Sequence, residues 1–105
     1  DIKQILALNS NALYASWMNE KHVFEQSYII KEKNQVVHGF MDLVIYKGDE
    51  IIIIDFKTDA TDNENKLIDM YAPQLQTYKH SMERITDLPI KTYIYAFSLF
   101  KCILL

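Results

Sequence analysis

The sequence has little of several residue types that mark specialised classes of protein. Its one cysteine, Cys102, cannot form a disulfide within the chain or build a cysteine-based zinc site, so we expect a reducing, cytoplasmic setting. Two glycines and two prolines exclude a collagen-like or low-complexity chain. Apolar runs such as residues 51–54 fall far short of the roughly 18 residues that span a membrane, so no membrane partner is expected.

What is present is typical of one small globular domain. Half of the 105 residues are hydrophobic and 24% are charged, which is an ordinary balance for a folded chain. The net charge of −3 contrasts with the basic character of most DNA-binding modules, although bound divalent cations would offset this objection. The chain begins at Asp1 without a methionine and ends on an apolar run, so we expect residues 1–105 to be a single domain and a fragment of a larger protein.

Apolar residues spaced three and four apart predict two helical regions. The first covers residues 1–20, with a bend or break at the polar residues 9–11. The second ends near residue 85. Pro73 is tolerated only in a first helical turn, which favours a start near Tyr71 over a start near residue 67. The polar residues 58–65 before it are expected to form a loop.

Strand patterns surround the second helix. Three β-like runs with short polar connections predict an antiparallel meander: residues 23–31, 36–46 and 51–57. A fourth β-rich run covers residues 90–100. Because the second helix connects the third run to the fourth, we expect an α/β fold in which a mixed sheet combines the meander with a crossover helix and a further strand.

Two aspartates and a lysine stand out on the second and third β-like runs. Side chains alternate along a strand, so Asp55 and Lys57 share a face, at the end of an apolar run typical of a strand covered on both sides. A turn at residues 47–50 brings Asp42 opposite Asp55, where like charges destabilise a strand pair. Two such carboxylates would hold a divalent cation, and Lys57 would lie beside the water or phosphate. The alternative is a surface ion pair between Asp55 and Lys57.

The second helix carries another pair of polar residues. Gln74 and Tyr78 are four residues apart, so they lie on one helix face. By itself this spacing favours an amphipathic helix whose tyrosine packs inward while its glutamine faces water.

Three motifs together resemble a known family. In chain order they are Gly-Phe-Met-Asp at residues 39–42, Ile-Ile-Asp-Phe-Lys-Thr-Asp at 53–59 and Tyr-Ala-Pro-Gln-Leu-Gln-Thr-Tyr at 71–78. They are similar to the nuclease domain of the RecB and AddA helicase–nucleases, within the PD-(D/E)xK nuclease superfamily. The likeness covers about residues 25–95 and implies a restriction-endonuclease-like core. Glu25 matches a commonly acidic position before the first strand, without an assigned role.

The resemblance implies a Mg²⁺-dependent deoxyribonuclease of exonuclease type, in which Mn²⁺ substitutes for Mg²⁺. Asp42, Asp55 and the backbone carbonyl of Phe56 would be metal ligands. Lys57 would position or activate the water. The implied partners are DNA and a helicase motor, in the same chain or in a partner subunit, and the implied process is double-strand break processing and recombinational repair.

The helix motif completes the implied site. Gln74 and Tyr78 would lie beside the active site and face the DNA, as DNA-binding or supporting residues.

Some features of the family are missing from this sequence. The family carries a metal-binding histidine on an upstream helix, whereas residues 1–20 contain none, and His22 and His38 lie in the wrong context. We therefore expect an incomplete active site with weak or no activity by itself. There is no phosphate-binding loop of a motor, and the lone cysteine excludes an iron–sulfur cluster.

Two other hypotheses remain beside the nuclease. A catalytically inactive nuclease-like module, serving DNA guidance or subunit contact, is disfavoured because the motif acids and lysine are all present. A small α/β domain with a surface ion pair and no nucleic-acid function is the third hypothesis.

Overall fold

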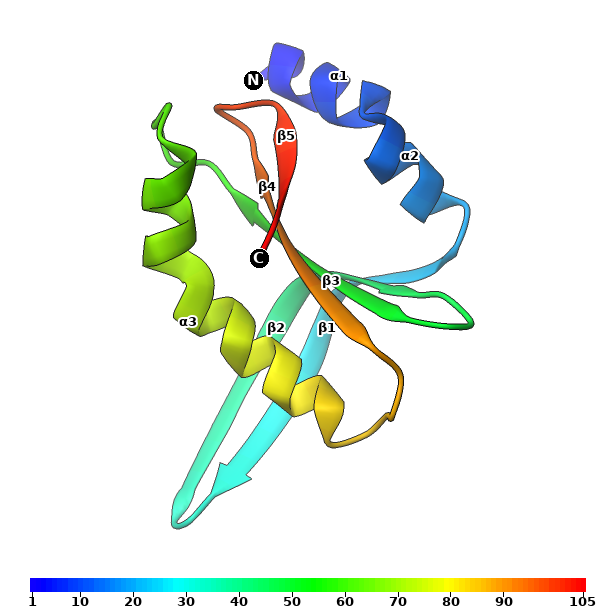
Figure 1. The fold of residues 1–105 in the computed structure, drawn as a ribbon, viewed down its shortest axis with the longest axis vertical. Coiled ribbons are helices and arrows are strands. Elements are labelled where there is room, and N and C mark those ends of the chain that lie inside the picture. Colours follow the sequence, from blue (N-terminus) through cyan, green and yellow to red (C-terminus); the bar gives the residue numbers. More distant parts are fainter.

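The computed structural model describes all residues, 1–105, and folds them around one five-stranded sheet (Figure 1). In chain order the elements are α1 (Ile2–Ser10), α2 (Ala12–Met18), β1 (Lys21–Glu32), β2 (Gln35–Tyr46), β3 (Ile51–Lys57), α3 (Glu64–Glu83), β4 (Ile90–Ala96) and β5 (Lys101–Leu104). The strands lie side by side in the order β1-β2-β3-β4-β5. Only β3 and β4, which α3 connects, are parallel. The α/β prediction of a meander, a crossover helix and a further strand is confirmed.

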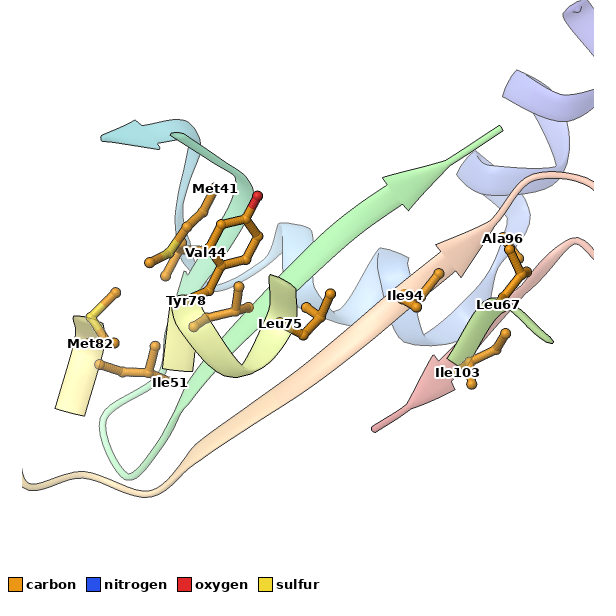
Figure 2. Close-up of a cluster of buried hydrophobic side chains, with 11 residues drawn as sticks. Met41, Val44, Ile51, Leu67, Leu75, Tyr78, Met82, Ile94, Ala96 and Ile103 are labelled. Atoms are coloured by element: carbon orange, nitrogen blue, oxygen red, sulfur yellow. The ribbon is translucent and has the colours of Figure 1, made fainter. Parts of the chain in front are cut away.

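Helices cover the sheet on both faces, which explains the uninterrupted apolar run of β3. The core on the α3 side contains Met41, Val44, Ile51, Ile53, Leu67, Leu75, Tyr78, Met82, Ile94, Ala96 and Ile103 (Figure 2). The core on the α2 side contains Trp17, Leu43, Ile45, Ile52, Ile54 and Tyr95. Alternate residues of β3 therefore enter different cores, and Asp55 follows Ile51 and Ile53 toward α3.

The break predicted in the first helix lies at Asn11. Asn11 has an extended backbone (φ −69°, ψ 122°), and its side chain accepts a hydrogen bond from the Tyr14 N–H, so it is the N-cap of α2. Its own N–H donates to the carbonyl of Leu8 at the end of α1. A single asparagine thus ends one helix and begins the next. None of the helices of the chain is long and apolar enough to cross a membrane.

The start predicted for α3 was wrong. The helix begins at Glu64, where the Asn63 side chain accepts from the Lys66 N–H, and Pro73 lies inside it. A proline ring removes one helical hydrogen bond, which would otherwise join residue 73 to the carbonyl of Asp69. Asp69 and Pro73 lie on the exposed side of the helix, so water can satisfy that carbonyl. Burial of the long apolar face of α3 outweighs the free-energy cost of the hydrogen bond lost at Pro73.

The last predicted strand, over residues 90–100, ends early and is followed by a further strand that was not predicted. β4 ends at Ala96, and the chain reverses through a turn closed by the hydrogen bond from Leu99 N–H to the Ala96 carbonyl, 3.1 Å. Phe100, with φ of 54°, leads into β5, which pairs antiparallel with β4. The turn at residues 97–100 contains no glycine, proline or asparagine, and Ser98 is its one residue of a usual turn type, so the turn signal in the sequence is weak.

Candidate active site

The candidate site lies where β2 and β3 separate beneath α3. The register of these strands is the expected one, with Tyr46 opposite Ile51 and Val44 opposite Ile53. Pairing stops at Leu43 and Ile54, one residue before Asp42 would face Asp55. From there the β1–β2 hairpin extends away from the rest of the sheet (Figure 1).

Asp42 occupies the gap that this separation leaves. Its Oδ2 accepts a hydrogen bond of 2.8 Å from the backbone N–H of Phe56. The carboxylate thus takes the place of the backbone carbonyl with which a continued ladder would pair this amide. Asp42 is therefore fixed to β3 next to Asp55, instead of standing on the sheet face as simple alternation predicts.

The alternation of side chains between the two faces of β2 is interrupted at Asp42. Leu43 belongs to the core on the α2 side, but Met41 joins Val44 in the core on the α3 side, although strict alternation would separate them. Across the β1–β2 ladder, Glu25 is the residue opposite Asp42, and it has a left-handed backbone with φ of 54°. Glu25 therefore lies inside β1 and not before the first strand, and its side chain is exposed.

Asp55 is almost completely buried, with 3% of its surface exposed. The pKa of Asp55 is raised to about 6, chiefly by burial and then by the neighbouring Asp42 carboxyl, while contact with Lys57 opposes the shift. Asp55 Oδ2 forms an ion pair of 2.7 Å with Lys57 Nζ. A buried carboxylate beside a second carboxyl is a suitable place for a cation.

Lys57 joins β3 to α3. Its Nζ contacts Asp55 Oδ2 and also donates a 3.0 Å hydrogen bond to Oε1 of Gln74. The ring centre of Tyr71 lies 4.0 Å from the same nitrogen. The side chain of Lys57 is only 17% exposed, so the ion pair with Asp55 is not the solvated surface pair of the alternative hypothesis.

The structure places the two helix-motif residues differently. Gln74 is exposed and reaches Lys57, whereas Tyr78 is 5% exposed and belongs to the α3-side core, beside Met41 and Val44 (Figure 2). Burial raises the pKa of Tyr78, and the charges of Asp55 and Asp42 add to the shift. Tyr78 therefore keeps its proton and lies near both acids without a hydrogen bond to either.

The oxygen donors at the site suit a hard divalent cation. The carbonyl of Lys57 accepts from the Phe97 N–H on the β4 side of β3. Successive peptide groups of a strand point in opposite directions, so the Phe56 carbonyl points to the β2 side, where Asp42 lies. The two carboxyls and this carbonyl are the donor set that the family resemblance implies. No group of three or more His, Cys, Asp or Glu residues gathers anywhere in the structure.

Two residues beside Lys57 were not singled out from the sequence. Tyr71 donates its hydroxyl to both carboxylate oxygens of Asp59, at 3.0 and 2.8 Å. This bond raises the pKa of the Tyr71 hydroxyl. Spacing could have identified Tyr71 from the sequence, because it precedes Gln74 by three residues and so lies on the same helix face.

Comparison with known proteins places the chain in a family. The chain matches the PD-(D/E)XK nuclease superfamily over residues 5–100. Three proteins named as ATP-dependent helicase/nuclease subunits resemble it: that of Syntrophomonas wolfei is 30% identical over 91% of this chain, that of Ligilactobacillus salivarius 39% over 70%, and that of Clostridium acetobutylicum 35% over 66%. The chain spans only 6–9% of the length of these relatives. Because the family match extends over nearly all of its residues, this chain belongs to the PD-(D/E)XK nuclease superfamily.

Proposed function

We propose that this chain is a metal-dependent nuclease domain that hydrolyses phosphodiester bonds in DNA, with Mg²⁺ as the cofactor and Mn²⁺ as a substitute. The observation that carries the proposal is the cluster of Asp42, Asp55 and Lys57 at the separation of β2 and β3. Each group is held by a specific contact: Asp42 by the Phe56 N–H, Asp55 by Lys57, and Lys57 by Gln74. A structural ion pair between Asp55 and Lys57 alone requires neither the second carboxyl of Asp42 nor the burial of Asp55.

The residues have distinct roles in this proposal. The carboxyls of Asp42 and Asp55 and the carbonyl of Phe56 would hold the cation. The cation would contribute positive charge to stabilise the developing charge on the phosphoryl oxygens. Lys57 would orient the attacking water and the scissile phosphate through its ammonium group. Gln74 restricts the position of that ammonium, and Tyr78 fills the core beneath the acids.

The names of the relatives support a wider setting for this domain. We propose that residues 1–105 are one nuclease domain that works with a helicase motor, in the same polypeptide or in a partner subunit, on cytoplasmic DNA. Processing of double-strand breaks for recombinational repair, with exonucleolytic cleavage, is the proposed process. The motor and partner would supply most contacts to phosphates, which is compatible with the acidic balance of this chain.

Metal binding is the first test. Titration calorimetry of the chain with Mn²⁺ and Mg²⁺ should show binding that Asp55→Ala abolishes. Asp62→Ala, a change at an exposed aspartate in the loop before α3, is the matched control and should bind as the wild type does. Equal binding by Asp55→Ala and the wild type would remove Asp55 from the site.

Cleavage is the second test, made on the full-length gene product. Lys57→Ala should lower nuclease turnover by at least ~10², since a positioned proton-transfer group contributes about 10² to 10⁴. Lys47→Ala, which also breaks a lysine ion pair, with Glu50, is the control and should keep full turnover. The fold and any ATP hydrolysis should stay largely intact in both, with some loss of melting temperature in Lys57→Ala because the buried Asp55 loses its partner. Metal binding without cleavage in the wild type would favour the inactive module.

A further inference from the structure

Lys57 has a third neighbour that the proposed mechanism leaves without a role. Asp55 and Gln74 contact the ammonium through oxygen atoms, at 2.7 and 3.0 Å. The Tyr71 ring covers the same ammonium, with its centre 4.0 Å from Nζ. An ammonium over the face of a phenol ring is attracted by the negative charge of the ring face.

The Tyr71 ring is itself held in place. Its hydroxyl donates to both oxygens of the Asp59 carboxylate, and Asp59 lies two residues after the end of β3. Donation to an anion polarises the hydroxyl and makes the ring a better partner for a cation. Asp59, Tyr71 and Lys57 therefore form a chain of contacts from the loop after β3, through α3, back to the last residue of β3.

We propose that Tyr71, oriented by Asp59, is a positioning residue for Lys57, and this inference rests on the proposed function of Lys57. A lysine side chain has four rotatable bonds, so an ammonium bound to a single carboxylate is free to take several positions. Asp55 and Gln74 limit this freedom from two directions. The ring of Tyr71 covers a further side of the ammonium.

The need for this third contact increases when the site holds a divalent cation. A cation on Asp55 neutralises the carboxylate that attracts Lys57 and repels the ammonium directly. The neutral Gln74 amide and the Tyr71 ring keep their attraction for the ammonium under those conditions. The position of Lys57 in the loaded site would then depend on these two groups of α3.

A purely structural role for Tyr71 makes a different prediction. Tyr71 also packs beside the α3-side core, so its removal can lower stability without any effect on Lys57. A measurement at Lys57 itself separates the two roles. An ammonium over an aromatic ring brings the adjacent Cε protons under the ring current, which moves their NMR signal upfield from those of the other lysines.

The experiment compares Tyr71→Leu, Tyr71→Phe and Met70→Leu, with the Lys57 signal assigned by its loss in Lys57→Arg. Met70 is exposed on the same helix and is the matched control. We expect an upfield Lys57 Cε-proton signal in the wild type and in Met70→Leu, both with and without Mg²⁺. Tyr71→Leu should lose it. In Tyr71→Phe, which keeps the ring but lacks the bond to Asp59, the upfield shift of the Lys57 Cε protons should lie between those of the wild type and Tyr71→Leu. This variant keeps the test decisive if Tyr71→Leu does not fold.

Kinetics on the full-length protein complete the test. Tyr71→Leu should lower kcat by about 10- to 100-fold at unchanged KM for DNA, as expected for a misplaced reactive group. A wild-type Lys57 signal in folded Tyr71→Leu, or wild-type kcat in that variant while Lys57→Ala is inactive, would overturn the inference alone. Wild-type turnover in Lys57→Ala would instead overturn the proposed function, and the NMR signal would still report whether Tyr71 positions the ammonium.

Discussion

The ring of Tyr28 lies directly against Gly39, its partner across the β1–β2 ladder. A Cβ atom on Gly39 would come within 2.8–2.9 Å of the Tyr28 ring and hydroxyl. Tyr28 also packs edge-to-face on Tyr78 of the helix motif, with ring centres 5.4 Å apart. The glycine of the first motif therefore makes room for an aromatic contact with the tyrosine of the third.

Gly39→Ala should displace Tyr28 and weaken its contact with Tyr78. An aromatic pair contributes about 0.5–1.5 kcal/mol, so we expect a loss of about 1 kcal/mol in the free energy of unfolding, measured by urea denaturation. Gly48→Ala is the matched control, because no atom lies within 4 Å of a Cβ there; it should be neutral or slightly stabilising. Equal stabilities of the two variants would show that Tyr28 adapts without cost.

Two substitutions at Asp42 should have opposite effects in metal-free protein. Asp42→Asn keeps an oxygen that can accept the Phe56 N–H and removes the repulsion of Asp55, so it should be neutral or stabilising. Asp42→Ala leaves that amide without its partner and should cost about 1–2 kcal/mol of unfolding free energy. Urea denaturation in EDTA measures both. A loss above ~2 kcal/mol in Asp42→Asn would show that the charge itself is structurally paired.

The raised pKa of Asp55 predicts a pH dependence of stability. The ordinary pKa of an aspartate is 3.8, whereas that of folded Asp55 is about 6, so the folded protein holds this proton more tightly than the unfolded chain. The resulting stabilisation is complete below about pH 4 and is lost as the pH rises to about 6. Asp55→Asn lacks this titration. In EDTA it should therefore gain about 1–3 kcal/mol over the wild type between pH 4 and 7.

The comparison is made at each pH by urea denaturation, because other carboxyls titrate in both proteins. Asp62→Asn, at an exposed position, should follow the wild type across the range. A constant difference between Asp55→Asn and the wild type from pH 4 to 7 would contradict the raised pKa.

Pro73→Ala should strengthen α3. The new N–H can donate to the Asp69 carbonyl, and alanine is the better helix former, so we expect a gain of about 1–2 kcal/mol after the greater freedom of the unfolded chain is considered. Thermal unfolding measures the gain. Ala72→Gly, the adjacent position changed to a poor helix former, should move the melting temperature in the other direction. A melting temperature of Pro73→Ala at or below that of the wild type would show that the proline shape is required next to Gln74.

The order of elements and the main cluster were predictable because they depend on local patterns. The apolar run between polar segments predicts the bounds of β3, and side-chain alternation along it places Asp55 and Lys57 on one face, where they form an ion pair. The exact meeting of Asp42 with β3 was not predictable. It depends on where the strands separate and on the left-handed backbone of Glu25, a conformation that glutamate rarely adopts.

Longer-range packing also overrode two local rules. Pro73 predicts a helix start, but apolar residues such as Leu67, before the proline, bury enough surface to extend α3 to Glu64. The chain reversal between Ala96 and Lys101 has only Ser98 as a usual turn residue, and it depends on pairing of β5 with β4. Tyr71 and Asp59 meet only because the loop after β3 folds back on α3.

The bond between Asp42 and the Phe56 amide has a consequence for how such domains change in evolution. The residue that would hold the metal also closes the junction between two strands, so most replacements there damage the fold and the chemistry together. Asparagine is the exception, since it removes the charge but can still accept the amide hydrogen. If selection for cleavage is lost, a single-nucleotide change of the aspartate codon can therefore produce a domain that is folded but inactive. Asparagine at position 42 would mark such a domain.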